Sequence, residues 1–262
     1  MELGLQTFTL HTLLRKPEDF DRRFAELAAM NLRNLELAVD YLPFDFSVAS
    51  AKVIAGAAQK HGLNIRSCQI KYATSANDIP LTIAYMQELG AETVTNSTID
   101  LKLLHQGEEG LLRYCDMLEQ LRLALAPAGI ALAHHNHHYE FLRVGNGSAL
   151  AFLAAHTKVD FALDTYWCQK GGGNVLTLLE DLQDRVPVMH LRDFTITKRG
   201  LVTGGIDCEI GRGNIPFKAI LKAAQAAGVR YGMIEQKTKT PMESIKTSWN
   251  SLGAISSLSA NS

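Results

Sequence analysis

Residues 130–164, IALAHHNHHYEFLRVGNGSALAFLAAHTKVDFALD, contain one complete strand–helix–strand unit. An apolar run at 130–135 ends in two histidines, and a helix-like segment follows at 148–155. A second apolar run at 159–164 ends in an aspartate. Strands that alternate with helices in this way are typical of α/β folds with a parallel sheet.

The same alternation extends outward over the whole chain, and it predicts one domain, residues 1–262, folded as a single (β/α)8 TIM barrel. Helices that end in glycine and strands of four to seven residues favour this closed form. We expect strands at 3–9, 34–38, 64–70, 92–96, 130–135, 159–164, 187–191 and 231–235. We expect helices at 17–30, 48–61, 80–89, 108–126, 148–155, 175–182, 216–227 and 241–252.

An open, doubly wound sheet is the structural alternative. That fold usually has a glycine-rich turn after its first strand, and residues 9–16 contain no glycine. The long segment 192–215 follows neither the strand nor the helix pattern. Its length is typical of a functional loop or of a loop that carries a small hairpin.

Composition narrows the class of protein. The chain has 26 basic and 27 acidic residues, which does not favour nucleic acid or an anionic membrane as a partner. Its four cysteines include no Cys-x-x-Cys pair, as is typical of reduced thiols. No apolar run reaches the roughly 20 residues of a membrane helix. We expect a cytoplasmic protein with a small-molecule substrate, and the sequence leaves a homo-oligomer open.

Four successive strands are expected to end in side chains that bind metal ions. Each residue alone also has a structural explanation, because a strand-end histidine is often hydrogen-bonded and a strand-end aspartate often caps a turn. Glu235 follows two apolar residues, so we expect it to be buried and to need a partner such as a cation. Imidazole and carboxylate groups suit Mn, Mg, Co or Zn. The first of these strands ends in the run His134-His135-Asn136-His137-His138-Tyr139-Glu140, and the next three end in Asp164, His190 and Glu235.

The motifs around these residues resemble those of the xylose isomerase-like TIM barrels known as sugar phosphate isomerases/epimerases. Relatives include inosose dehydratase, ketose 3-epimerase and hydroxypyruvate isomerase. The resemblance covers most of the chain. The similar motifs are His135-Asn136-His137-His138-Tyr139-Glu140-Phe141, Asp164-Thr165-Tyr166-Trp167, His190-Leu191-Arg192-Asp193 and Ile234-Glu235-Gln236.

This resemblance implies roles for individual residues. Asp164, His190 and Glu235 would bind the metal, and the fourth ligand would be either His135 or Glu140. Glu235 is the expected catalytic base, and Glu140 the partner carboxylate on the opposite face of the substrate. The expected substrate-binding residues are His137, Trp167 and Arg192, although Trp167 could equally be a core residue.

The resemblance also implies an activity. We expect a divalent-metal-dependent isomerase or epimerase of a small sugar, keto-sugar or polyol derivative, which removes a proton next to a metal-bound carbonyl. An inosose-type dehydratase is the alternative. An abasic-site endonuclease-like hydrolase and a non-catalytic sugar-binding barrel are less favoured.

Two departures from the family pattern add cations near the rim. Arg212 stands in the Gly211-Arg212-Gly213 turn, where the family often has glutamate, and Lys237 stands where it often has aspartate. These cations would favour a more acidic substrate than a neutral sugar, unless both are solvated loop charges.

Overall fold

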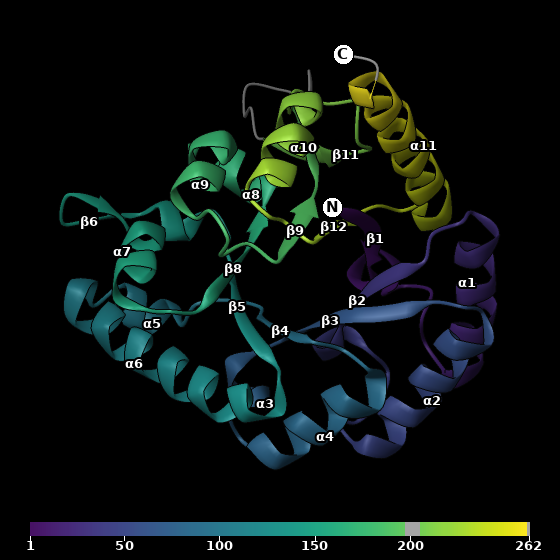
Figure 1. Cartoon of the computed structure of the whole chain (residues 1–262), viewed down its shortest axis with the longest axis horizontal. Helices are drawn as coiled ribbons and strands as arrows, with labels where there is room; N and C mark the ends of the chain where they lie inside the picture. Colours follow the sequence, from purple (N-terminus) through teal and green to yellow (C-terminus); the bar gives the residue numbers. More distant parts are fainter. Residues whose placement is uncertain (197–204, 261–262) are drawn as a thin grey trace.

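The described residues of the computed structural model, 1–196 and 205–260, form a closed barrel of eight parallel strands (Figure 1). The first strand pairs with the last, which closes the ring and confirms the predicted (β/α)8 barrel over the open sheet. The strands are β1 (Glu2–Gln6), β2 (Asn34–Ala38), β3 (Asn64–Ile70), β4 (Thr93–Asn96), β5 (Ala131–His135), β8 (Asp160–Asp164), β9 (Val188–Leu191) and β12 (Tyr231–Ile234).

The predicted helices are present around this barrel, with bounds that differ from the predicted ones by a few residues at most, except at the last helix. That helix extends to Ala260 rather than to residue 252. The helices are α1 (Pro17–Ala29), α2 (Val48–Lys60), α4 (Ile79–Leu89), α6 (Gly107–Leu125), α7 (Ala149–His156), α9 (Val175–Asp181), α10 (Phe217–Ala226) and α11 (Pro241–Ala260). Among the described residues, no helix is long and apolar enough to span a membrane.

Short elements occupy several of the connections. The first strand ends at Gln6 rather than at residue 9, because the Gln6 side chain accepts a hydrogen bond from the Phe8 backbone N–H and starts a 3-10 turn. The other short elements are α3 (Tyr72–Ser75), α5 (Leu101–Leu104), α8 (Thr165–Lys170), and the 3-10 turns η1 (Thr7–Leu10), η2 (Val39–Tyr41), η3 (Ala126–Ala128) and η4 (Tyr139–Phe141), with the hairpin β6 (Arg143–Val144) and β7 (Gly147–Ser148).

Local chemistry explains where the helices begin and end. The Asp78 side chain caps α4 by accepting a hydrogen bond from the Leu81 N–H at 2.9 Å. The same helix ends at Gly90, whose φ of +67° is the left-handed conformation that glycine adopts without strain. The helices pack on the barrel through apolar stripes, such as the fully buried Phe20, Phe24 and Leu27 of α1.

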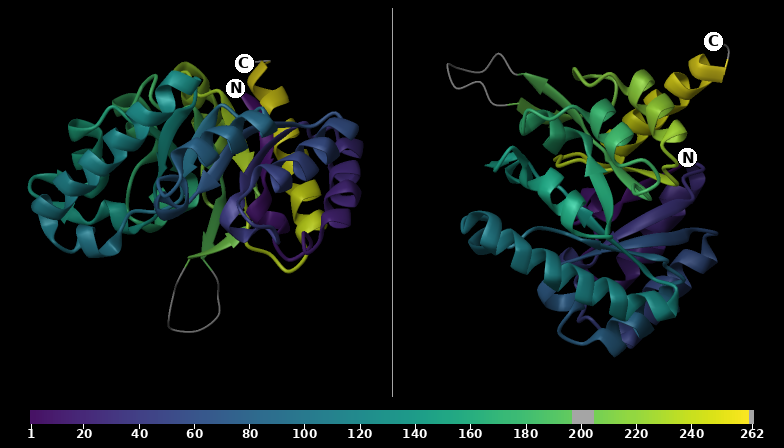
Figure 2. Two further views of the ribbon diagram at one scale, coloured as in Figure 1. Left: turned by 90° about the horizontal axis from the view of Figure 1, so that it is seen from below. Right: turned by 60° about the vertical axis from the view of Figure 1, so that its left-hand side comes forward.

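A small hairpin projects from the mouth of the barrel (Figure 2). Strands β10 (Asp193–Ile196) and β11 (Gly205–Cys208) pair antiparallel within the segment for which a functional loop or a hairpin was predicted. This hairpin places Asp207 beside the open end of the barrel, next to Arg192.

Candidate metal centre and active-site pocket

The strand period of two places four candidate metal-binding side chains inside the barrel. A small apolar cluster, separate from the large core, fills the lower interior, and its members are Ala133, Ala162, Val188, Tyr231 and Met233. The residue two positions further along a strand points to the same side. On four neighbouring strands these next residues are His135, Asp164, His190 and Glu235.

These four side chains meet at one point above the apolar layer. All four are buried, and one possible ligand atom from each lies within 4.8 Å of the others. His190 Nδ1 lies 2.8 Å from Glu235 Oε2, and His135 Nε2 lies 3.7 Å from Asp164 Oδ2. Two imidazoles and two carboxylates form a ligand set that suits a divalent transition metal.

The hydrogen bonding of the cluster fits a bound cation. His135 Nε2, His190 Nδ1 and Glu235 Oε2 are buried and have no hydrogen-bond partner within the described part of the chain. Although His190 Nδ1 and Glu235 Oε2 are close, their geometry is not that of a hydrogen bond. Buried polar atoms without a partner are costly, and a shared cation would satisfy all three.

Glu36 on β2 orients one of the candidate ligands. Its Oε1 lies 2.6 Å from His190 Nε2, while its Oε2 accepts hydrogen bonds from the hydroxyls of Ser67 and Thr95. A carboxylate on one imidazole nitrogen directs the other nitrogen toward the metal. His190 therefore presents Nδ1 to the cluster.

Burial and charge set the ionisation of the cluster. Burial lowers the pKa of His135 to about 3, assisted by His190, so His135 is neutral and can donate its lone pair. For His190, burial lowers the pKa, but Glu36 and Glu235 outweigh it and raise the pKa to about 10. Burial raises the pKa of Glu235, but Arg192 and His190 outweigh it and hold the pKa well below its usual range.

Asp164 combines the capping role and the cluster role that the sequence left as alternatives. Its Oδ1 accepts a hydrogen bond from the Trp167 N–H at 2.8 Å and caps α8. Its Oδ2 faces His135, His190 and Arg192. Because the helix cap holds Oδ1, the orientation of the carboxylate is fixed, and Oδ2 is the oxygen that faces the cluster.

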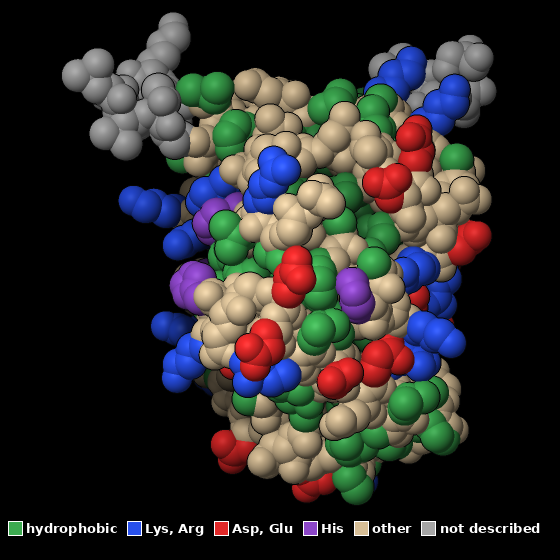
Figure 3. All heavy atoms as spheres, turned by 90° about the vertical axis from the view of Figure 1, so that its left-hand side faces the viewer, with side chains coloured by type: hydrophobic (Ala, Val, Ile, Leu, Met, Phe, Trp, Pro, Cys, Tyr) green, Lys and Arg blue, Asp and Glu red, His purple; other side chains and the backbone are tan. Residues whose placement is uncertain are grey.

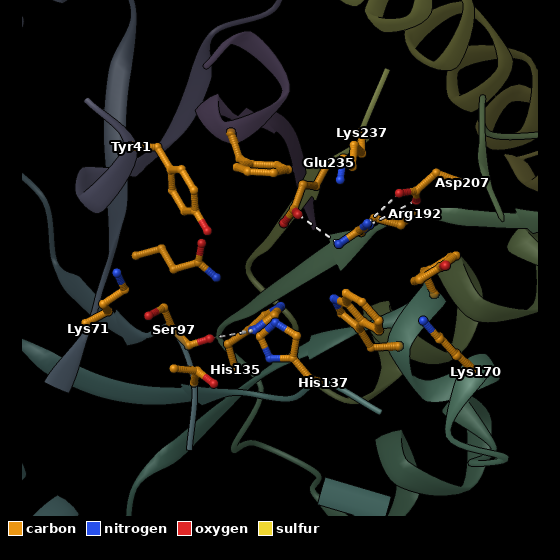
Figure 4. A pocket seen from close by; sticks show the side chains of 15 residues that line it. Tyr41, Lys71, Ser97, His135, His137, Lys170, Arg192, Asp207, Glu235 and Lys237 are labelled. Atoms are coloured by element: carbon orange, nitrogen blue, oxygen red, sulfur yellow. Dashed lines mark hydrogen bonds and ion pairs between the residues drawn. The ribbon is translucent and has the colours of Figure 1, made fainter. Parts of the chain in front are cut away.

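A cavity of about 510 Å³ opens above the cluster (Figure 4). His135 and Glu235 face each other across it, and Arg192 lies beside Glu235. Its wall includes the aromatic side chains of Phe8, Tyr41, Tyr166 and Trp167 and the polar side chains of Gln69, Ser97 and Thr98. A pocket of this size fits a small sugar or polyol.

Comparison with known proteins identifies the family to which the chain belongs. The profile of the xylose isomerase-like TIM barrel family matches residues 24–250. The chain belongs to this family. A search of curated proteins gives no match.

Solved structures of the xylose isomerase-like fold are similar to this chain over nearly its whole length. A sugar phosphate isomerase/epimerase from Parabacteroides distasonis has a TM-score of 0.76 at 20% identity, covering 96% of this chain and 93% of the other. An L-ribulose 3-epimerase has a TM-score of 0.69 at 16% identity, covering 99% of this chain and 95% of the other. A probable 3-DHS dehydratase from Bacillus anthracis has a TM-score of 0.70 at 9% identity, covering 97% and 99%. At these identities the likeness shows the fold.

Of the two residues expected as fourth ligand in this xylose isomerase-like barrel, His135 lies in the cluster. Glu140 lies in η4 and does not line the cavity. Its Oε2 accepts a hydrogen bond from the His137 N–H at 2.9 Å, and its Oε1 lies 3.4 Å from His134 Nε2. The structure therefore does not bring Glu140 to the other four carboxylate and imidazole groups.

The three expected substrate-binding residues all line the cavity. Arg192 is bound to three carboxylates, with Nη1 facing Glu235 at 2.9 Å and Asp164 at 3.4 Å, and with Nε and Nη2 on Asp207. His137 Nδ1 and Trp167 Nε1 are buried without a partner in the described chain. Their free polar atoms can bind a ligand, which favours the pocket reading of Trp167 over the core reading.

Sequence reasoning missed part of the pocket and the orienting role of Glu36. The signal for Glu36 was present, because a glutamate between the apolar Leu35 and Leu37 in a strand needs a buried partner. Tyr41 and Lys71 follow β2 and β3 in loops. The two positions carry no periodic signal, so only the closed barrel reveals that they face Glu235 across the cavity.

Proposed function

We propose that the protein is a divalent-metal-dependent isomerase or epimerase that acts on a small sugar, keto-sugar or polyol derivative. The observation that carries this proposal is the group of four buried ligand side chains at the base of an open pocket, with Glu235 belonging to both. A divalent cation held by His135, Asp164, His190 and Glu235 would polarise a substrate carbonyl and acidify the neighbouring C–H.

Glu235 is the proposed base. Arg192 fixes Oε1 at 2.9 Å, while Oε2 has no hydrogen-bond partner in the described residues. The carboxylate can therefore take a proton from a substrate carbon at the pocket base. His137 Nδ1 and Trp167 Nε1 are available to hold substrate hydroxyls, and the aromatic wall limits access of water to the reacting carbon.

Of the carboxylates in the pocket lining, Glu235 best fits the role of base. Within the described lining, Asp207 is the second carboxylate, and Arg192 binds both of its oxygens. Glu235 is thus the lining carboxylate whose second oxygen is not held by Arg192, and that oxygen faces the proposed metal. A single base can move a proton between adjacent carbons on one face, whereas inversion at one carbon would use a second acid–base group from the opposite wall, where Tyr41 and Lys71 lie.

Hydrogen–deuterium exchange tests the proposal. Protein supplied with Mn²⁺ or Co²⁺ is incubated in deuterated water with a panel of ketoses and aldoses in neutral, carboxylated and phosphorylated forms, and mass spectrometry follows exchange at the carbon next to the carbonyl. A dehydratase would be recognised by loss of water from the product. We expect exchange with at least one member of the panel, and none in protein stripped with a chelator.

Glu235→Gln tests the base, with Glu180→Gln on the exposed surface of α9 as the matched control. We expect exchange to fall at least about 100-fold in the first variant and to stay unchanged in the control. Metal content is measured in the same samples, because Glu235 is also a proposed ligand. Wild-type exchange in metal-loaded Glu235→Gln would remove it as the base.

A further inference from the structure

The pocket wall has an excess of positive charge, although the chain as a whole has a net charge of −1. The cationic side chains in the described lining are Lys71, Lys170, Arg192 and Lys237, and the acidic ones are Asp207 and Glu235. In Figure 3, Lys, Arg and His side chains gather along the left edge, the side to which β10 and β11 project in the right-hand view of Figure 2. The pocket at the open end of the barrel is thus lined by more cationic than acidic side chains.

Arg192 neutralises the acidic side chains of the wall. Its guanidinium contacts Glu235 and Asp207, and also reaches Asp164 behind them. All the carboxylates near the cavity mouth are therefore already paired with a cation. The three lysines are different, because none of them has an ion pair with a carboxylate anywhere in the described residues.

Two of these lysines stand on the same side of the cavity as Arg192, and Lys71 stands on the opposite side (Figure 4). Lys170 Nζ lies 4.8 Å from the centroid of the Trp167 ring, so the aromatic wall supports the ammonium group. The same indole has its N–H buried with no acceptor in the described chain. An indole N–H only donates, so it is available to an acceptor oxygen of a ligand in the pocket.

We infer that the substrate carries an anionic group, a carboxylate or a phosphate, and that the positive charge of Lys170 and Lys237 on the pocket wall attracts it. This inference rests on the proposed function, and it names the class of substrate. Arg192 positions Glu235, and four of its five N–H donors are already directed at Glu235, Asp164 and Asp207. Of the two cations that the sequence pattern added to the rim, Lys237 lines this wall, while Arg212 lies outside the lining.

Binding of unreactive probes tests the inference without turnover. Isothermal titration calorimetry compares ribitol, ribonate and ribitol 5-phosphate on the full-length protein with Mn²⁺ present. Ribitol is the neutral reference, and the two anions separate a carboxylate from a phosphate. The variants are Lys170→Met combined with Lys237→Met, and the control is Lys52→Met on the exposed face of α2, outside the pocket.

We expect at least one anion to bind about tenfold more tightly than ribitol, and to weaken about tenfold in the double variant, since a charge-assisted hydrogen bond is lost. Ribitol binding should change less than about twofold in either variant, and the control should match the wild type. The stronger anion identifies the group. Equal binding of the neutral and anionic probes, absence of binding by both anions, or an anion preference that survives in the double variant would overturn the inference.

Failure of the proposed function has a different signature. In that case no sugar exchanges deuterium, whether the anionic probes bind or not. Conversely, exchange with a neutral ketose but not with its acid or phosphate counterpart would retain the proposed function and reject the anionic substrate.

Discussion

Replacing Glu36 with glutamine should weaken the metal centre without touching any of its proposed ligands. The carboxylate contacts His190 Nε2 at 2.6 Å, Ser67 Oγ at 2.5 Å and Thr95 Oγ1 at 3.2 Å. Glutamine has the same shape, its amide oxygen can still accept from His190, and its amide N–H groups can donate to the two hydroxyls. The hydrogen bonds are kept, and the negative charge behind His190 is lost.

The size of the effect follows from this arrangement. Removing the outer carboxylate of a carboxylate–histidine–metal chain typically costs about 10- to 100-fold in metal affinity, or about 1.4–2.7 kcal/mol. We expect Glu36→Gln to fall in this range, because the fully buried pair has no water to replace the lost charge. The affinity is measured by competition with a chromogenic chelator for Mn²⁺ or Co²⁺.

Two comparisons make the result specific. Glu180→Gln, a surface change on α9, should bind metal as the wild type does, and circular dichroism should show the same helix content for all three proteins. A Glu36→Gln protein that is folded and binds metal with wild-type affinity would refute the orienting role. A loss much greater than 100-fold would indicate instead that Glu36 is itself a ligand.

Three further predictions concern the site, the thiols and the core. Asp164→Ala and His190→Ala should each lose bound metal while keeping the barrel, as seen by elemental analysis beside circular dichroism; full metal occupancy in both would make these residues structural. Burial raises the pKa of Cys115 to about 11 and of Cys208 to about 12, so both thiols stay protonated until the pH approaches those values. Iodoacetamide at pH 8 should therefore label the native protein much more slowly than the urea-unfolded protein, and rapid labelling of Cys208 in the native protein would contradict this. Phe24→Ala removes a fully buried ring from α1 and should lower the free energy of unfolding by about 3–5 kcal/mol in urea titrations, whereas a loss below 1 kcal/mol would show that its site collapses around the cavity.

The barrel was predictable because the sequence alternates between segments with the strand period of two residues and segments with the helix period of 3.6 residues. The interior positions of four strands hold small or aliphatic residues such as Ala133 and Val188, and the position two residues later changes to a polar ligand. The helices carry independent end signals, such as Asp78 and Gly90 at the two ends of α4. Strand ends could therefore be placed to within a few residues, and with them the four candidate ligands.

The choice between His135 and Glu140 as the fourth candidate ligand depended on the conformation of the loop after β5, which the hydrophobic periodicity of the sequence does not encode. Glu140 is five residues beyond the end of β5, and a 3-10 turn directs its carboxylate back to the backbone N–H of His137. The sequence pattern likewise did not predict α8, which begins at Thr165 directly after its cap residue Asp164, or the position of Lys71 in the loop after β3. In each case the side chain is placed by backbone hydrogen bonds of a few residues, which have no periodic signature.

The buried carboxylate of Asp193 determines which changes the turn at Gly211-Arg212-Gly213 can tolerate. Asp193 accepts hydrogen bonds from the backbone N–H groups of Gly211, Gly213 and Ile215. A methyl group on Gly213 would collide with this carboxylate, and Gly211 has a φ of +85°, so both glycines are restricted. The exposed residue between them, Arg212, contributes only its backbone to the turn. An exchange between acidic and basic residues at this middle position should therefore change the surface charge without altering the loop.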